Sequence, residues 1–358
     1  MSAPAVYING RFYGQSTSGQ QRYGREVVRQ IDALLGKQGS RARWILLTPP
    51  GAETVALENI EQRTVGGLSS HGWDQVSFYL AARGGVALGL NGSGPLLHGR
   101  QVVVIHDAAV YRHPEHFSGT YGRMHRTIGR LLSRRATIGT VSRFSQAELA
   151  DVLGIPASGI VLAPNGGDHL DLSGDADIVS RLGLADKPFF VTIGNLTRNK
   201  NVAVAVRALG LLPEGSAKLV AVGKLDEKLF GDAGLPVSGD MILPGRLSDA
   251  EIVGLMQQAR ALIFPSLYEG FGIPPLEAMA NGCPVLASAI PAVQETCEGA
   301  AAYFEPHDEA ALSQLMQRAV ADEAWRAGMA SVGRDRVALF RWSAPARALI
   351  AACEKLLP

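Results

Sequence analysis

Short apolar runs alternate with segments of helical hydrophobic spacing along the whole chain. Runs of this kind, bounded by turn residues, are typical of strands buried on both faces of a parallel sheet. In the first half the predicted strands are residues 6–8, 44–47, 102–105, 137–141 and 160–162. In the second half they are residues 189–193, 218–222, 241–243, 261–264 and 285–287. The predicted helices are residues 23–35, 202–212, 248–259 and 277–281. This alternation predicts an α/β fold with parallel sheets covered by helices on both faces.

The two halves share this pattern and are separated by a polar segment. A chain of 358 residues is too long for one ordinary core and suits two domains. Residues 168–187 are polar and contain five aspartates, so we place the domain boundary there. The prediction is a first doubly wound domain over residues 1–170 and a second over residues 171–343. The last segment, residues 344–358, has the pattern of an amphipathic helix.

Composition excludes several classes of protein. A hydrophobic content of 47% with 19% charged residues is globular, and a net charge of +1 argues against a nucleic-acid partner. Cys283, Cys297 and Cys353 have no metal-binding or disulfide spacing, which predicts buried thiols. Residues 1–8 lack the regions of a signal peptide, and no apolar stretch suits a membrane span. We therefore expect a cytoplasmic protein.

The segment from Glu269 to Glu277 carries the most informative chemistry. It follows an apolar run and contains two glycines and two prolines ahead of a helix-forming run. Gly270 and Gly272 let bare backbone approach a ligand, and the prolines suit a first helical turn whose free N–H groups attract an anion. The two carboxylates would repel a bare phosphate but accept hydrogen bonds from hydroxyls. A nucleotide sugar meets both demands.

This spacing of glutamates resembles the E-x7-E signature of the retaining glycosyltransferases of family 4, which have the GT-B fold. Other motifs of that family occur in the expected order, at residues 18–23, 106–107, 140–145, 164–166, 194–201 and 290–293. The resemblance implies two doubly wound Rossmann-like domains that face each other across a cleft. It implies that the second domain holds the nucleotide sugar and the first the acceptor. It also implies that the last helix crosses back to the first domain.

The loop after residues 189–193 is where a doubly wound sheet binds its ligand. Lys200 matches the family's lysine that neutralises the donor diphosphate, and such a cation stabilises charge growing on the leaving group. The family often has arginine where this chain has Asn195, so Arg198 is our candidate for the second positive charge. The predicted donor-binding residues are Gly19, Gly194, Asn195, Lys200, Glu269, Gly270, Phe271, Gly272, Ile273 and Glu277.

The resemblance also implies roles for individual side chains. Glu269 would contact the sugar hydroxyls, and Glu277 would accept hydrogen bonds from the ribose. The predicted catalytic residues are Lys200, Arg198, Glu269 and His106. The predicted acceptor residues are Arg22, Tyr23 and Asp107, of which the last is expected to orient or support rather than act as a base. No pair of catalytic carboxylates is evident, which fits a retaining reaction without a side-chain nucleophile.

Two other patterns resemble metal sites. Asp175 and Asp177 match the D-x-D motif of the other large glycosyltransferase fold, but they lie in the polar linker, which favours solvated charge. His113 and His116 flank Pro114, which breaks the helical geometry of a ligand pair. We predict neither a metal nor another cofactor.

Residues 122–135 contain five arginines, no acidic residue and an apolar stripe at helical spacing. One interpretation is a helix that rests on an anionic membrane, which would place the protein peripherally on the inner face of the plasma membrane, or that receives a pyrophosphate-linked lipid acceptor. The other interpretation is an ordinary packed helix with a basic outer face.

Residues 8–12, 18–23, 72–75 and 106–107 resemble bacterial mannosyltransferases of surface polysaccharide assembly. This implies transfer of mannose from GDP-mannose, with retention, to a hydroxyl of a glycan or lipid-linked glycan. UDP-sugars and other GDP-hexoses remain open as donors. The alternatives are a GT-B sugar-nucleotide epimerase and an inactive nucleotide-sugar-binding subunit, the latter supported by the missing arginine at Asn195.

Overall fold

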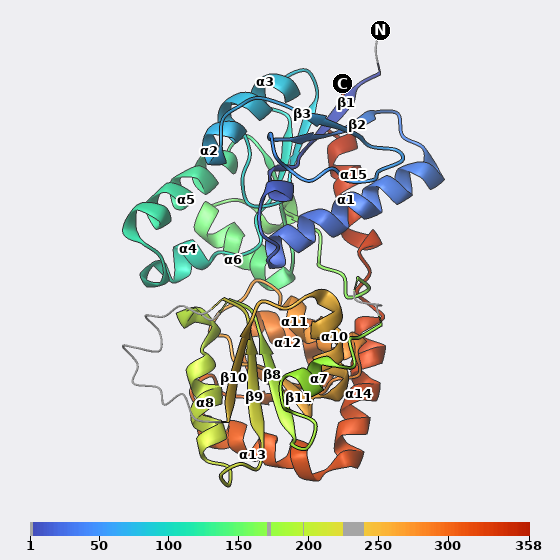
Figure 1. Cartoon of the computed structure of the whole chain (residues 1–358). Coiled ribbons are helices and arrows are strands. Elements are labelled where there is room, and N and C mark those ends of the chain that lie inside the picture. Colours follow the sequence, from blue (N-terminus) through green and yellow to red (C-terminus); the bar gives the residue numbers. More distant parts are fainter. Residues whose placement is uncertain (1–2, 170–172, 196, 225–239) are drawn as a thin grey trace. The chain divides into compact units, whose positions relative to one another are not determined.

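The computed structural model describes residues 3–169, 173–195, 197–224 and 240–358, and the chain divides into two compact units. Unit 1 consists of Met1–Gly166 and Arg341–Pro358, and unit 2 of Gly167–Phe340. Each unit has its own parallel sheet with helices packed against it (Figure 1). The predicted α/β class with two Rossmann-like sheets is confirmed.

Unit 1 contains a seven-stranded parallel sheet in the order β3-β2-β1-β4-β5-β6-β7. The strands are β1 (Ala5–Asn9), β2 (Arg43–Thr48), β3 (Glu61–Thr64), β4 (Val86–Gly89), β5 (Gln101–Val104), β6 (Thr137–Thr140) and β7 (Val161–Leu162). The strand order reverses between β1 and β4, and the carboxyl ends at such a switch point are where these sheets bind ligands.

The longest helix of unit 1 is α1 (Gly19–Gln38), which packs against α15 (Ser343–Glu354) from the end of the chain. The other helices are α2 (Ser70–Gly72), the π-helix η2 (Trp73–Phe78), α3 (Tyr79–Ala82), α4 (Ala109–Arg112), α5 (Gly119–Leu132) and α6 (Arg143–Leu153). Short 3-10 turns are η1 (Arg11–Gly14), η3 (Pro114–His116) and η4 (Ala157–Gly159).

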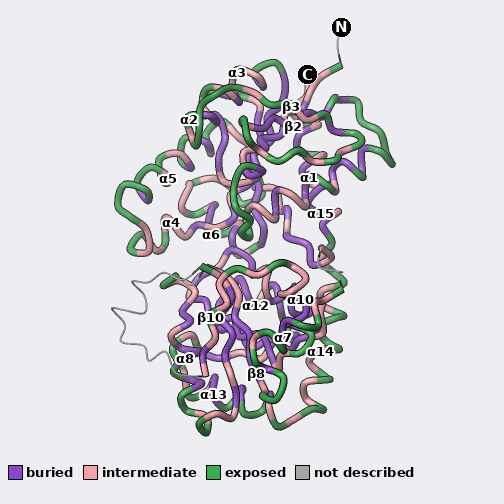
Figure 2. The backbone as a smooth tube through the Cα atoms, in the orientation of Figure 1, coloured by how far each residue is buried: buried purple, intermediate pink, exposed green. Residues whose placement is uncertain are grey.

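Unit 2 contains a six-stranded parallel sheet in the order β10-β9-β8-β11-β12-β13. The strands are β8 (Phe189–Ile193), β9 (Lys218–Val222), β10 (Met241–Gly245), β11 (Ala261–Phe264), β12 (Val285–Ser288) and β13 (Ala302–Phe304). Its switch point lies between β8 and β11. Both of these strands are buried along nearly their whole length, as Figure 2 shows for the interior of each unit.

The helices of unit 2 lie on both faces of its sheet (Figure 1). They are α7 (Ile178–Arg181), η5 (Arg198–Lys200), α8 (Val202–Gly210), α10 (Asp249–Gln258), α11 (Ile273–Ala280), α12 (Pro291–Cys297), η6 (Glu298–Ala300), α13 (Glu309–Ala321) and α14 (Glu323–Val337). The capping box of Ser248 and Glu251 at the start of α10 closes in both directions, as expected from the sequence. All three cysteines are buried free thiols, which confirms that prediction.

Strands β3, β4 and β13 and helices α6, α12, α13 and α14 were not among the predicted elements. Strand β3 has no apolar run because it is a largely exposed edge strand, so hydrophobicity does not mark it. Helix α11 begins at Ile273, four residues before the predicted start at residue 277. Pro274 and Pro275 occupy its first turn, where a missing N–H group costs no hydrogen bond. None of the described helices has the length and apolar character needed to cross a membrane.

Candidate functional site

Two loops of unit 2 meet at its switch point, one after β8 and one after β11. The Leu267 N–H donates to the Asn199 carbonyl (2.9 Å), and the Asn199 amide donates to the Tyr268 carbonyl (2.8 Å). These bonds hold the loops together although they are far apart in sequence. The Lys200 ammonium forms an ion pair with Glu269 and lies 5.4 Å from the centre of the Phe264 ring. The structure therefore brings together two of the predicted donor residues.

Glycines shape the backbone of both loops. Gly194 has φ +139° directly after β8, and Gly272 has φ +102° as the residue that precedes α11. A side chain at either position would be strained, because L residues rarely adopt these angles. The Phe271 carbonyl accepts a hydrogen bond from the Thr296 hydroxyl (2.9 Å), which fixes the loop between Gly270 and Ile273. The predicted amide-lined loop is thus anchored by a hydrogen bond from α12.

Glu277 lies in the first half of α11 and is nearly buried. Its Oε1 lies 2.9 Å from Nε2 of His169, and their side chains are only 8% and 1% exposed. A buried carboxylate needs a hydrogen-bonded partner, and His169 supplies one. Sequence reasoning missed His169, which follows the motif at residues 164–166 without belonging to it. Its partner is 108 residues away, so only the folded chain reveals the pair.

The remaining predicted residues of this loop are less enclosed. Asn195 and Arg198 are exposed, and Arg198 is the first residue of η5. Leu196, which stands between them in the motif, lies outside the described residues. The structure therefore leaves the assignment of Arg198 as the second cation a prediction.

His106 follows β5 in unit 1 and is buried. Its Nε2 lies 2.8 Å from the Leu90 carbonyl, and the Ser145 hydroxyl donates to the His106 carbonyl (3.1 Å). Burial lowers the pKa of His106 to about 4, although the bond to Leu90 opposes this. The ring is therefore neutral at neutral pH. Since a carbonyl can only accept, Nε2 carries the proton and donates it to Leu90.

The three predicted acceptor residues have different surroundings. Tyr23 is fully buried, and its hydroxyl donates to the Ala163 carbonyl (3.0 Å). An acceptor role for Tyr23 is therefore not supported, because its ring lies in the core and its hydroxyl already has a protein partner. Asp107 accepts a hydrogen bond from the Ala109 N–H (2.8 Å), which is a supporting role at the start of α4. Arg22 and Gly19 lie in the first turn of α1, where Gly19 is exposed.

The two motifs that resemble metal sites form ion pairs. Asp175 is bound by Arg181 (2.8 Å) at the surface of unit 2. His113 Nδ1 lies 3.2 Å from the Glu115 carboxylate, and His116 Nε2 lies 3.8 Å from it. Pro114 lies in the 3-10 helix η3, which brings potential ligand atoms of His113, Glu115 and His116 within 4.8 Å of one another.

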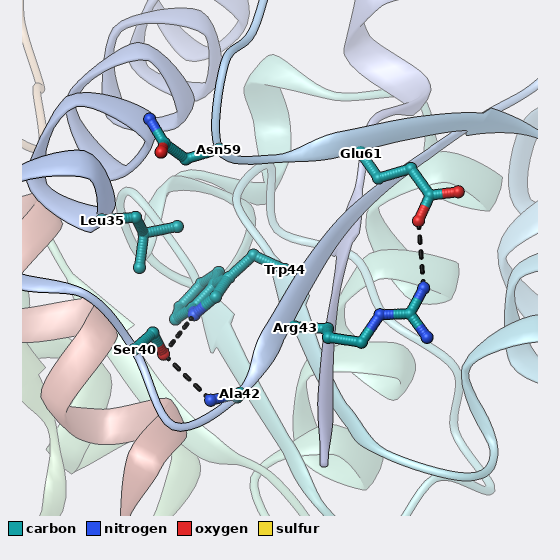
Figure 3. Close-up of a pocket in the computed structure, with 7 residues that line it drawn as sticks. All are labelled: Leu35, Ser40, Ala42, Arg43, Trp44, Asn59 and Glu61. Atoms are coloured by element: carbon teal, nitrogen blue, oxygen red, sulfur yellow. Dashed lines mark hydrogen bonds and ion pairs between the residues drawn. The ribbon is translucent and has the colours of Figure 1, made fainter. Parts of the chain in front are cut away.

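Unit 1 also has a surface hollow of about 330 Å³ (Figure 3). It is lined by Leu35, Ser40, Ala42, Arg43, Trp44, Asn59 and Glu61. The Trp44 Nε1 donates to the Ser40 hydroxyl (3.1 Å), and Arg43 pairs with Glu61 (3.1 Å). The hollow lies where β2 and β3 begin, whereas such sheets bind ligands where strands end. It contains none of the predicted residues and is not part of the candidate site.

Comparison with known proteins gives a consistent result. The family described as "Glycosyl transferases group 1" matches residues 176–336, all within unit 2. O-antigen chain mannosyltransferase B of Escherichia coli is 27% identical over 68% of this chain and 67% of its own length. O-antigen chain mannosyltransferase RfbU of Salmonella typhimurium is 25% identical over 85% and 88%. The serotype-specific mannosyltransferase WbdA of Escherichia coli is 26% identical over 72% of this chain, which spans 34% of that relative.

Two solved structures align with nearly the whole of this chain. Sucrose-phosphate synthase from Thermosynechococcus elongatus has a TM-score of 0.74 at 21% identity, covering 99% of each chain. WaaG, a glycosyltransferase involved in lipopolysaccharide biosynthesis, has a TM-score of 0.72 at 18% identity, covering 96% of this chain and 98% of its own. At such identities these likenesses show the fold. The family match places residues 176–336 of unit 2 among the glycosyltransferases of family 4, and the solved structures show that the chain has the GT-B fold.

Proposed function

We propose that the protein transfers a hexose from a nucleotide diphosphate sugar to a hydroxyl of a glycan or lipid-linked glycan, with retention at the anomeric carbon. The observation that carries this proposal is the meeting of Lys200 and Glu269 at the switch point of unit 2, where a doubly wound sheet binds its ligand. GDP-mannose is the preferred donor, because several related proteins are named mannosyltransferases.

Donor binding would exchange the partners of this ion pair. The Lys200 side chain is 26% exposed and that of Glu269 is 16% exposed, so a ligand can reach both. The diphosphate would take over the ammonium, and the freed carboxylate would accept hydrogen bonds from the sugar hydroxyls. An ion pair that water can still reach contributes little stability by itself, so this exchange costs little. The site is thus prepared for a ligand that carries both anionic and hydroxyl groups.

The reaction needs charge stabilisation on the leaving group. As the bond between anomeric carbon and phosphate oxygen breaks, negative charge grows on the nucleoside diphosphate, and Lys200 is positioned to stabilise it. The acceptor hydroxyl would lose its proton to the leaving phosphate on the same face of the sugar. Attack from that face preserves the anomeric configuration and needs no side-chain nucleophile.

A panel of nucleotide sugars, incubated with the protein with and without lipid extract, tests the proposal. A new glycoside together with free GDP or UDP supports it. A changed donor sugar without acceptor indicates the epimerase, and binding without turnover indicates the inactive subunit. Either of these results contradicts the proposed transfer.

His169 provides a prediction for the ribose contact assigned to Glu277. His169→Ala removes the partner of this nearly buried carboxylate, so we expect the KM for the donor to rise about tenfold, the value of one or two hydrogen bonds. The kcat should change less, since the ribose is remote from the reacting bond. Steady-state kinetics measure both.

His169→Gln, whose amide can donate to Glu277, should recover part of the donor affinity. His307→Ala at an exposed site of unit 2 is the matched control. An equal fall in kcat and kcat/KM without a change in KM would exclude this positioning role.

Helix α5 supports peripheral contact with an anionic membrane, at the inner face of the plasma membrane. Tyr121, Met124 and Leu131 are 45%, 38% and 40% exposed, although a packed apolar stripe would bury them. Exposed arginines flank them at positions 123, 130, 134 and 135. Apolar side chains among basic residues are the combination that binds anionic lipid surfaces.

Co-sedimentation with vesicles tests this contact. The protein should pellet with phosphatidylglycerol vesicles and remain in solution with phosphatidylcholine alone. Arg123→Glu with Arg130→Glu should weaken binding strongly, since each basic residue contributes about 1 kcal/mol near the surface. Arg207→Glu with Arg318→Glu in unit 2 is the control. No pelleting with the acidic vesicles at low salt would rule the contact out.

A further inference from the structure

Arg336 lies in the last turn of α14 and holds the end of α12. Its Nε donates to the Thr296 carbonyl (2.8 Å), and its Nη2 donates to the Glu295 carbonyl (2.6 Å). Both carbonyls belong to the last turn of α12, where a helix leaves its carbonyls without intrahelical donors and carries partial negative charge. The Arg336 side chain is 14% exposed, so little water competes for these bonds. The guanidinium therefore fixes the end of α12.

The backbone directly after α12 requires such support. Glu298 has φ +44° and ψ −126°, angles that residues other than glycine rarely adopt. Its carboxylate lies 2.9 Å from Nη2 of Arg336. A strained residue persists only where surrounding contacts hold it, and such residues cluster where function depends on a fixed geometry. Arg336 supplies one of those contacts.

Thr296 connects the end of α12 to the loop between Gly270 and Ile273. Thr296 is 1% exposed, and its hydroxyl donates to the Phe271 carbonyl (2.9 Å). Because Arg336 holds the Thr296 carbonyl, it also restricts the hydroxyl that anchors the loop. A shift at the end of α12 would therefore move Phe271.

Phe340 provides a second connection between Arg336 and the same residue of the loop. The Arg336 guanidinium lies 5.0 Å from the centre of the Phe340 ring, which is a cation–π distance. The Phe340 ring meets the Phe271 ring edge to face, with centres 5.6 Å apart and planes at 81°. Arg336 thus holds the main chain of Phe271 through Thr296 and its ring through Phe340.

The residues beside Phe271 carry the predicted donor contacts. Glu269 pairs with Lys200, and the N–H groups of residues 270–273 are expected to face the sugar or the diphosphate. Gly272 follows at φ +102°. Glycine adds conformational freedom to a chain, so this segment depends on outside contacts to keep one conformation. A loop that is competent for only part of the time binds its ligand more weakly by that fraction.

We propose that Arg336 is a positioning residue for the donor loop, defined as residues 269–273, and acts on it through Thr296 and Phe340. This assignment rests on the proposed function, in which that loop receives the nucleotide sugar. Loss of the guanidinium should loosen the loop and weaken donor binding. The kcat should change less, since Lys200 stands on the loop after β8.

Hydrogen–deuterium exchange of the full-length chain tests this network without a ligand. Arg336→Met keeps an aliphatic stem but removes every donor, so the amides of the donor loop should exchange about tenfold faster. Arg336→Lys keeps a cation and should recover part of the protection. Unchanged exchange of the donor loop in Arg336→Met overturns the proposal.

Arg326→Met is the matched control, because Arg326 caps α13 as Arg336 caps α12. Arg326 belongs to the same helix, and its Nη1 donates to the Ala319 carbonyl (2.7 Å). It lies about 15 Å earlier along the helix axis. The donor loop should exchange in Arg326→Met as in the wild type. An increase equal to that in Arg336→Met would mean general loosening of unit 2 and would overturn the positioning role.

Thr296→Val tests the same connection with Arg336 in place. Valine has the shape of threonine without the hydroxyl, so the Phe271 carbonyl loses its donor. The donor loop should exchange faster in Thr296→Val, whereas Thr296→Ser keeps a hydroxyl and should remain close to the wild type. Equal exchange of the loop in these two variants contradicts the proposal.

Titration with GDP and UDP separates this inference from the proposed function. Arg336→Met should raise the Kd of the bound nucleotide about tenfold, and Arg326→Met should leave it unchanged. Equal affinity in both variants overturns the positioning role and leaves the transfer proposal intact. If neither nucleotide binds the wild type while the loop still responds to Arg336→Met, the network remains and the proposed function fails.

Discussion

Lys200→Ala is expected to lower kcat by about a hundred- to a thousandfold, equivalent to ~2.7–4 kcal/mol of transition-state stabilisation. The ammonium contacts Glu269, and in the proposed reaction it faces the leaving diphosphate. Charge on that group is greatest in the transition state, so its loss should affect kcat more than donor affinity. Initial rates at saturating and subsaturating donor measure the two effects.

Matched variants separate this role from general damage. Lys187→Ala, which removes an exposed lysine elsewhere in unit 2, should retain full activity. Lys200→Arg should lie between the wild type and the alanine variant, because it keeps the charge with a different shape. A loss below about tenfold for Lys200→Ala, with unchanged thermal stability, would remove Lys200 from the catalytic assignment.

Trp342→Ala is expected to destabilise unit 1 by about 3–5 kcal/mol, the range for deleting a large buried aromatic side chain. Trp342 is fully buried, and its ring centre lies 5.8 Å from that of Tyr23 on α1. A Cβ atom added to Gly166 would lie 2.5 Å from the indole, so the ring fills the space that glycine leaves. The substitution leaves a cavity beside the attachment of α15 to α1.

Urea unfolding followed by circular dichroism measures this loss. Leu339→Ala is the control, because Leu339 is 70% exposed and its truncation should change stability by less than about 0.5 kcal/mol. If the two variants unfold at the same urea concentration, the indole contributes no packing that its neighbours cannot replace.

Local pattern was sufficient for much of the architecture. Buried parallel strands are continuous apolar runs, so strands such as β8 and β11 were predicted with nearly their observed bounds. The capping box at Ser248 was predicted because both of its partners lie within one helical turn. Strand β3 escaped prediction, since an exposed edge strand has no apolar run.

The resemblance to family 4 identified Lys200 and Glu269, and the fold places them in contact although they are 69 residues apart. The same resemblance suggested Tyr23 as an acceptor residue, but tertiary packing places its ring in the core. Lys200, Glu269 and Tyr23 were all chosen because they belong to short motifs. A motif specifies the residue type at a position, but not whether other elements of the fold pack over that side chain.

The amino-acid sequence alone determined the α/β class, the paired Rossmann-like sheets and the loops to which we assign the donor, because these depend on periodicity and on residues close together in the chain. Tertiary structure alone decided the partnership of His169 with Glu277 and the contacts that connect Arg336 to Phe271. These contacts depend on strand order and helix packing, which bring distant segments together and which no local spacing encodes.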